Sequence, residues 1–310
     1  MSLERYTFKD LIHNPPPETE WIVPGLIPEG CFIVAGPPKI GKSWWALQLA
    51  TSVAQGALAF DKFETERGRV FYFALEDSKT RIHKRLLLQG LAQEDDQVEY
   101  IHRCPYGEEA VKEIHRLFLE CPDTKLVLID TLEKVRGPRT TANMYEADYQ
   151  AVGMFQELAT EYHKAIGIFH HVRKNTPDNI EEAVSGSFGL TGAADSFFII
   201  HRDVPIDYDA GMFINGRDIE RRSFGLTFDD EKFLWSYHDE ISSGKMSPIR
   251  QAILEAVTKI GIPCKPKNIA EMMYPGGPTE AEYNNIRQTL PDMVKAGQLR
   301  QPARGAYCLP

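Results

Sequence analysis

The chain has 310 residues, 43% of them hydrophobic and 25% charged, which is ordinary for a globular protein with one large core and a second, smaller one. No apolar run approaches the roughly 20 residues that a membrane-spanning helix needs, and the first residues lack the pattern of a signal peptide. The five cysteines form no CxxC or Cys/His cluster, so neither a disulfide framework nor a zinc site is expected. These features predict a cytoplasmic protein without a membrane partner.

The formal net charge of −9 is unevenly distributed. Residues 247–310 hold eight Lys or Arg and five Asp or Glu, whereas the rest of the chain holds 27 and 39. The C-terminal segment is therefore slightly basic and the remainder acidic. A basic segment favours contact with nucleic acid, although many small solvated domains carry an equal excess.

Residues 1–30 contain five prolines and are expected to form an extended lead-in. Short apolar runs then alternate with stretches whose apolar residues recur at helical spacing. Strands are expected at residues 31–35, 70–75, 126–129, 165–169 and 196–200, and helices at residues 42–54, 78–91, 109–120 and 145–162. Nearly continuous apolar strands separated by amphipathic helices predict an α/β fold with a mostly parallel sheet covered on both faces.

The helical pattern stops after residue 200. Three runs at residues 212–215, 224–228 and 233–237 indicate antiparallel strands that extend one edge of the sheet. The small, polar residues 241–247 are typical of a linker. The sequence therefore predicts a large domain of residues 1–240 and a small domain of residues 248–310.

The small domain is expected to contain three helices followed by a hairpin that closes on Tyr307. Ser247 and Pro248 are a favourable cap and first turn for the first helix. The second and third helices are expected at residues 266–274 and 279–296, where Pro291 should kink the last one or end it early. This order of elements resembles a winged helix.

The segment from Gly36 to Ser43 fits the pattern G-x-x-x-x-G-K-[ST] and lies between an apolar strand and a helix. Its glycines let main-chain N–H groups close around the β-phosphate, and the helix N-terminus adds a partial positive charge. Lys42 would neutralise the β- and γ-phosphates, and Ser43 would hold Mg²⁺. The candidate ATP-binding residues are Gly36, Pro37, Pro38, Lys39, Ile40, Gly41, Lys42, Ser43 and Trp44. The alternative is an ordinary glycine-rich turn.

Two acidic residues are expected to complete the site. Asp130 follows the apolar run of residues 126–129 and is the candidate Walker B carboxylate that orients Mg²⁺ together with Ser43. Glu76 follows the strand of residues 70–75 and is the candidate catalytic base, because ligands of open α/β sheets bind at the carboxyl ends of strands. The alternative for each acid is a capping role at the next helix, in which Asp77 or Ser78 serves beside Glu76.

His170 and His171 follow the strand of residues 165–169. Either imidazole could hydrogen-bond the γ-phosphate or the attacking water and report hydrolysis to the loop that follows. The sequence does not say which of the two does so. The alternative is that both are ordinary surface histidines.

These elements, with an acid on the strand between Walker A and Walker B, resemble the RecA/DnaB superfamily over roughly residues 20–240. More narrowly, the chain resembles the RepA-type hexameric helicases of plasmids, phages and mobile elements. The segments that carry the resemblance are GPPKIGKSWWALQLA, FYFALEDS, LVLIDTLEKVRG, IFHHVRKN and SGSFGLTGAADSFFIIHRD. The resemblance implies a RecA-like ATPase domain that binds ATP and Mg²⁺ and assembles into a homo-oligomer, with a hexamer as the family's form.

In this family an arginine enters the ATP site of the neighbouring subunit, and the resemblance places Arg217 in that role. The DnaB pattern has a lysine two residues earlier, where this chain has Asn215, so the assignment departs from the pattern. The alternatives are a surface pair of Arg217 with Asp218, or Arg202 or Arg173 as the arginine that acts in trans.

The resemblance also implies that the loop around residues 175–194 faces a central channel that holds single-stranded DNA. Its candidate phosphate contacts are Ser185, Gly186, Ser187 and Thr191. In the winged-helix-like domain the candidate DNA contacts are Asn285, Arg287, Arg300 and Arg304. The alternatives are a flexible Gly/Ser loop in the first case and a protein-docking module in the second.

The leading hypothesis is a ring-forming, ATP-driven DNA helicase or translocase from the replication of a plasmid, phage or mobile element. A second hypothesis is a nucleotide-dependent regulator whose small domain binds an operator or a partner, which the acidic ATPase domain favours because a helicase channel should be basic. A third is a recombination or repair ATPase that forms filaments on DNA without unwinding it.

Overall fold

The computed structural model describes residues 5–90, 97–137, 144–171, 188–202, 204, 208–240, 248–295, 298–303 and 305–309. Its main sheet contains β3 (Gly30–Gly36), β4 (Arg69–Ala74), β5 (Val98–Ile101), β6 (Thr124–Asp130), β7 (Ala165–His171), β8 (Ser196–His201), β9 (Ala210–Gly216), β10 (Arg222–Asp229) and β11 (Leu234–Glu240). The strand order is β11-β10-β9-β8-β3-β7-β6-β4-β5. The strands from β8 to β5 are parallel, and β9, β10 and β11 extend one edge in antiparallel order. The predicted α/β sheet with its antiparallel extension is confirmed.

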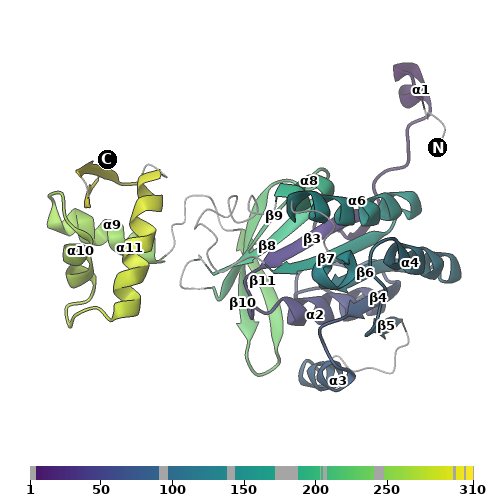
Figure 1. The fold of residues 1–310 in the computed structure, drawn as a ribbon, viewed down its shortest axis with the longest axis horizontal. Coiled ribbons are helices and arrows are strands. Elements are labelled where there is room, and N and C mark those ends of the chain that lie inside the picture. Colours follow the sequence, from purple (N-terminus) through teal and green to yellow (C-terminus); the bar gives the residue numbers. More distant parts are fainter. Residues whose placement is uncertain are drawn as a thin grey trace.

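Helices cover both faces of this sheet (Figure 1). On one face lie α2 (Lys42–Gln55) and α3 (Lys79–Leu88), and on the other lie α4 (Glu108–Glu120), α6 (Met144–Tyr162) and the short α8 (Phe188–Ala193). The strand residues alternate between two apolar clusters, so that Phe32 and Val34 pack toward α2 whereas Cys31 and Ile33 pack toward α6. The parallel strands are therefore buried on both sides, which explains their nearly continuous apolar sequence.

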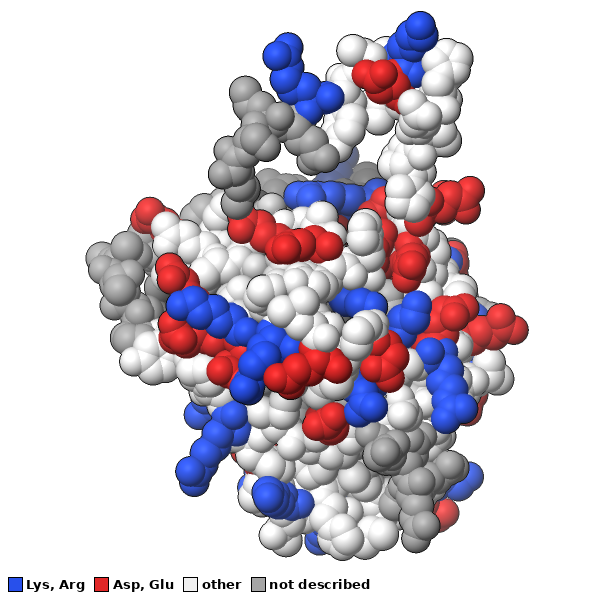
Figure 2. All heavy atoms as spheres, turned by 90° about the vertical axis from the view of Figure 1, so that its right-hand side faces the viewer, with Lys and Arg blue, Asp and Glu red and all other residues white. Residues whose placement is uncertain are grey.

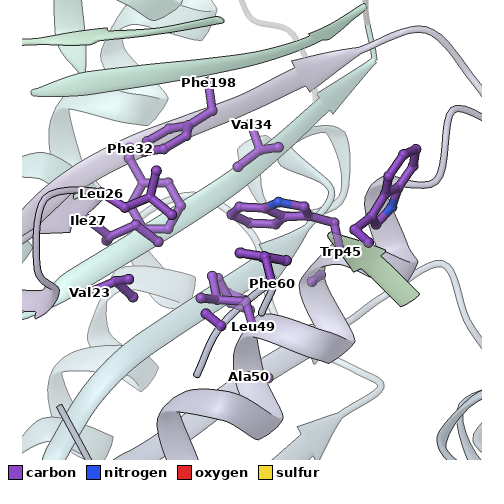
Figure 3. Packing of buried hydrophobic residues seen from close by; sticks show 14 of the residues in the cluster. Val23, Leu26, Ile27, Phe32, Val34, Trp45, Leu49, Ala50, Phe60 and Phe198 are labelled. Carbon is purple, nitrogen blue, oxygen red and sulfur yellow. The ribbon is translucent and has the colours of Figure 1, made fainter. Parts of the chain in front are cut away.

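The core beneath α2 fixes this helix, and with it the loop that precedes it. Trp45 and Leu49 of α2 point toward Phe32, Val34 and Phe198 of the sheet (Figure 3). The Trp45 ring also stacks on Phe60, with ring centroids 5.0 Å apart. Burial of side chains of this size stabilises a fold by about 1.5–3 kcal/mol each. The start of α2 is thus set on a rigid base.

The N-terminal residues differ from the extended lead-in that the prolines suggested. Residues Phe8–His13 form α1, whose start is fixed by a capping box in which Thr7 and Asp10 exchange hydrogen bonds. Trp21–Val23 (β1) and Ile27–Pro28 (β2) pair as a small antiparallel sheet. The side chains of Ile22, Val23, Leu26 and Ile27 are buried in the α2 core. The small sheet was not predicted because its short apolar runs lie between prolines, which are typical of loops.

Three further elements were not predicted: the edge strand β5, the short helix α5 (Leu132–Arg136) and α8. They are too short for a periodic pattern to emerge from the sequence. The predicted helix at residues 78–91 ends earlier than expected, at Leu88. Within the described residues, no helix combines the length and the apolar character that a membrane crossing requires.

The C-terminal residues form α9 (Pro248–Ile260), α10 (Pro266–Met273) and α11 (Glu280–Lys295), followed by the hairpin of β12 (Arg300–Ala303) and β13 (Ala306–Cys308). They enclose a core of their own, which includes Ile253, Ile286 and Leu290. Of the two effects expected of Pro291, an early end of the third helix is wrong, because α11 continues to Lys295, and a kink stays a prediction. The predicted linker at residues 241–247 lies outside the described residues, and the division into two domains stays a prediction.

Candidate functional site

The loop from Gly36 to Ser43 joins the end of β3 to the start of α2, at the carboxyl edge of the parallel strands. Lys39 and Gly41 both adopt positive φ angles, of 64° and 103°. A Cβ atom at residue 41 would lie 2.7 Å from the ring of Trp235, so the loop requires glycine there for space as well as for backbone freedom. Main-chain N–H groups of such a loop, at the start of a helix, are a favourable place for a phosphate to bind.

Lys42 is 5% exposed, and its ammonium group lies within the loop itself. Its Nζ donates to the carbonyl oxygens of Gly36 at 2.7 Å and Pro37 at 3.1 Å, and it lies 3.0 Å from His171 Nδ1. Burial lowers the pKa of Lys42 to about 8, against the opposing effect of the Asp130 and Glu76 carboxylates. A buried cation surrounded by carbonyls is well placed to exchange these contacts for phosphate oxygens.

Ser43 and Asp130 come together as the sequence predicted. Ser43 Oγ donates to Asp130 Oδ2 at 2.9 Å, and the hydroxyl of buried Tyr72 donates to the same oxygen at 3.2 Å. Burial raises the pKa of Asp130, while the hydrogen bonds from Ser43 and Tyr72 oppose that rise. In the described part of the chain no group of three or more His, Cys, Asp or Glu could hold a metal. Nucleotide-bound Mg²⁺ needs only one or two protein oxygens, so Ser43 and Asp130 fit it.

Glu76 lies just beyond β4, on the same edge of the sheet as the loop. Its Oε1 accepts a hydrogen bond of 3.2 Å from the Thr131 hydroxyl, and its Oε2 lies 3.5 Å from His171 Nε2. The neighbouring acid has a different role, because Asp77 forms ion pairs with Arg81 and Arg85 of α3. The structural tasks at this turn therefore fall to Asp77 and to Ser78, the N-cap of α3, and the Glu76 carboxylate faces the loop.

The two histidines point to opposite faces of the sheet. His171 lies between Lys42 and Glu76, on the face that α2 covers. His170 is 9% exposed and faces α5, with Nδ1 3.4 Å from Glu133 Oε1. Burial lowers the pKa of His170. Of the two candidates, His171 is the one that lies next to Lys42 and Glu76, and His170 belongs to a second polar cluster on the other face of the sheet.

The hairpin of β10 and β11 holds the phosphate-binding loop in place. Trp235 Nε1 donates to the Gly41 carbonyl at 3.2 Å, and Gln48 of α2 exchanges two hydrogen bonds with the main chain of Trp235. The ring of Trp44 stacks on Phe233 and lies beneath the Arg85 guanidinium. Trp44 is also one of the residues that line the pocket beside the loop.

Replacement of Trp235 by Phe should weaken the affinity for Mg·ATP about fivefold, because the loss of one hydrogen bond costs about 1 kcal/mol. The indole N–H that fixes the Gly41 carbonyl is lost, and the loop gains freedom that a bound nucleotide must restrict. Equilibrium titration with a fluorescent ATP analogue measures the change. Trp21→Phe, in β1, is the matched control and should bind like the wild type. Equal affinity of Trp235→Phe and the wild type would contradict this role.

Arg217 lies at the amino ends of the parallel strands, whereas the loop lies at their carboxyl ends. It follows β9, which runs antiparallel to β8, and its Nη1 donates to Asp195 Oδ1 at 2.9 Å. Its partner is therefore Asp195 rather than the Asp218 considered from the sequence. The Arg217 side chain is 62% exposed. Arg202 instead lies beside the loop of its own chain, and Arg173 lies outside the described residues.

The candidate DNA contacts are described only in part. Ser185, Gly186, Ser187 and Arg304 lie outside the described residues, as does the side chain of Thr191 in α8. Asn285 and Arg287 are exposed on α11, and Arg300 is exposed on β12. The guanidinium of Arg287 lies 5.9 Å from the centre of the Tyr283 ring. These exposed positions leave the side chains accessible, and DNA contact stays a prediction.

Sequence analysis missed Tyr72, Thr131, Glu133 and Trp235. Tyr72 lies on the same face of β4 as Ala74, and alternation along the strand could have placed it beside the Walker B acid. Thr131 is the residue directly after Asp130, and Glu133 lies three residues after Asp130. Trp235 carries no motif signal, because it reaches the loop only through the fold of the β10–β11 hairpin.

This loop lies between a central parallel strand and a helix, and its serine contacts an acid from another strand, which is the arrangement of a P-loop ATPase domain. The chain belongs to the AAA_25 family, described as an AAA domain, whose model matches residues 2–177.

Two solved structures share the fold at low sequence identity. The first is described as an ATPase domain: the TM-score is 0.54 at 14% identity, over 68% of this chain and 85% of that one. The second is a DnaB-like replicative helicase described with its primase interactions: the TM-score is 0.57 at 14% identity, over 74% of this chain and 66% of that one. At this identity the likeness concerns the fold alone.

Proposed function

We propose that this protein is an ATP-hydrolysing motor that forms a ring and acts as a DNA helicase or translocase in the replication of a plasmid, phage or mobile element. The observation that carries the proposal is the convergence of Lys42, Ser43, Asp130, Glu76 and His171 at one edge of the sheet. Lys42 and the loop amides bind the β- and γ-phosphates, and Ser43 and Asp130 would hold the Mg²⁺ that accompanies the nucleotide.

Each residue then has one task in hydrolysis. Glu76 accepts a proton from the water that attacks the γ-phosphorus, and the Lys42 ammonium stabilises the charge that develops on the phosphate oxygens. His171 lies between them, within 3.0 Å of Lys42 and 3.5 Å of Glu76, where it can contact the γ-phosphate when Lys42 moves onto it. Bound Mg²⁺ supplies charge neutralisation and orients the triphosphate.

A pocket of about 360 Å³ beside the loop supports a place for the nucleoside. It is lined by the loop residues Lys39, Ile40 and Gly41, and by groups that suit a base and ribose: an apolar ring, a guanidinium and two carboxylates. These groups belong to Phe228, Arg202, Asp209 and Asp230. Because Arg202 lies in this pocket of its own chain, it is a poorer candidate than Arg217 for an arginine that acts in trans.

The proposal of a ring-shaped assembly is based on the resemblance to hexameric helicases. The position of Arg217 in the fold is compatible with such an assembly. Arg217 is exposed and lies across the sheet from its own loop, as a residue must when it serves the next subunit in a head-to-tail ring. One face of the molecule shows acidic and basic side chains interspersed (Figure 2). On α4, Lys112 forms an ion pair with Glu109.

The assembly is tested by mixing variants. Arg217→Ala should lower the ATPase activity of the assembled protein about 10³-fold and leave nucleotide binding intact. Lys42→Ala subunits should also be inactive, but mixed rings should regain activity, because some interfaces combine an intact Lys42 with an intact Arg217. ATPase rates with single-stranded DNA measure both effects. Arg221→Ala, an exposed arginine nearby, is the control. Normal turnover by Arg217→Ala would refute the assignment.

A nucleotide-dependent regulator is the second candidate, favoured by the acidic balance of residues 1–246 and the basic balance of residues 247–310. In that case ATP controls assembly and the C-terminal helices bind duplex DNA or a protein. Native mass measurement with an ATP analogue, with and without single-stranded DNA, separates the two. A hexamer that displaces strands supports the motor, whereas a smaller species that binds only duplex supports the regulator.

A further inference from the structure

Thr131 is a buried residue whose hydroxyl does not form the capping hydrogen bond expected at the start of a helix. It is the N-cap of α5, and N-cap threonines usually accept a hydrogen bond from the main chain one turn into the helix. Here the side chain makes no such bond. Thr131 is 0% exposed, so its hydroxyl needs a partner inside the protein.

The partner is the candidate catalytic base. The Thr131 hydroxyl donates to Oε1 of Glu76 at 3.2 Å, and the other carboxylate oxygen, Oε2, faces His171 at 3.5 Å. Glu76 lies on a turn and its side chain is 41% exposed, so without such contacts it would sample several rotamers. The two contacts select one orientation of the carboxylate.

Behind Thr131, a second carboxylate completes the arrangement. Glu133, two residues after Thr131, has its Oε1 atom 3.4 Å from Nδ1 of buried His170. Because α5 begins directly after β6, Thr131 is fixed between the Walker B strand and this Glu133–His170 pair. The hydroxyl is therefore held on a rigid support, as a group that orients a reactive side chain must be.

We propose that Thr131 is a positioning residue for ATP hydrolysis, whose hydroxyl orients the Glu76 carboxylate for proton abstraction from water. This proposal rests on the proposed function, since it requires Glu76 to act as the base. Thr131 makes no contact with the substrate in this role. Its effect appears in the rate of the chemical step rather than in nucleotide binding.

The test compares three replacements of Thr131 in the full chain. Thr131→Val keeps the shape and removes the hydroxyl, Thr131→Ala removes both hydroxyl and methyl, and Thr131→Ser keeps the hydroxyl. We expect kcat to fall about tenfold in the Val and Ala variants, with KM and Mg·ATP affinity unchanged, and to remain near wild type in the Ser variant. A purely structural role would instead follow side-chain volume, with Ser resembling Ala. Melting curves and nucleotide titration verify that each variant is folded.

A double-mutant cycle with Glu76→Gln connects the effect to the base. In the Glu76→Gln background, Thr131→Val should lower the residual turnover by less than twofold. Wild-type kcat in both Thr131→Val and Thr131→Ala, or full additivity with Glu76→Gln, would overturn the proposal. Failure of the proposed function would look different, because Glu76→Gln alone would then retain wild-type turnover.

Discussion

Replacement of Glu76 by Gln should lower ATP turnover by about two orders of magnitude or more, while Mg·ATP remains bound. The amide keeps the size of the side chain and its hydrogen bond from Thr131, but it cannot accept a proton from the attacking water. Phosphate release under saturating ATP measures the loss. Titration with Mg·ATP should show an affinity within a few-fold of the wild type, since Glu76 is not needed to hold the phosphates.

Asp77→Asn is the matched control for this prediction. Asp77 is the adjacent acid, and its carboxylate pairs with Arg81 and Arg85 of α3. Its replacement should lower the melting temperature and leave turnover per folded molecule largely intact. The reverse result, with Asp77→Asn inactive and Glu76→Gln active, would move the catalytic base to Asp77.

The second large effect is expected from Lys42→Ala, which should weaken Mg·ATP binding about 100-fold, equivalent to about 2.7 kcal/mol. The ammonium group is the only side-chain cation that the structure places within the described part of the loop interior, and charged hydrogen bonds of this kind contribute about 1.5–3 kcal/mol. Binding is measured by titration with an ATP analogue that is not hydrolysed.

Lys112→Ala controls for the loss of one positive charge, because Lys112 is exposed on α4 and paired with Glu109. It should bind Mg·ATP like the wild type. The Lys42→Ala protein should remain folded, since Lys42 is a buried charge whose removal relieves a desolvation cost. If Lys42→Ala binds Mg·ATP as tightly as Lys112→Ala, the loop is not the nucleotide site.

The sequence was sufficient to predict the loop, the parallel sheet and its antiparallel extension. This succeeded because the motif from Gly36 to Ser43 requires a strand before it and a helix after it, and the apolar runs supplied both. Asp130 could be predicted for the same reason: carboxyl ends of parallel strands meet at one edge. The geometry that joins Ser43 to Asp130 follows directly from that rule.

The roles of the two histidines could not be separated from the sequence. Adjacent residues of a strand point to opposite faces, so only one of the pair could reach Lys42. The choice depends on which face α2 covers, and this is a property of the three-dimensional connection rather than of the local pattern. The structure puts His171 on the α2 face and His170 on the face of α5.

Other features depend on contacts between residues far apart in the chain. Trp235 reaches Gly41 across 194 positions, and no local signal predicts such a pair. Thr131 could be predicted as a helix cap, but not as the partner of Glu76, which lies 55 residues away, just after another strand. The N-terminal sheet was missed because short apolar runs between prolines resemble loops.

Calorimetric titration of the unmodified chain with a non-hydrolysable ATP analogue, in the presence and absence of Mg²⁺, tests the central claim most directly. We predict one nucleotide bound per chain, with clearly weaker binding once Mg²⁺ is removed, because Ser43 and Asp130 then lose the ion that joins them to the phosphates. A protein that shows no binding heat, or that binds equally well without Mg²⁺, would contradict the account.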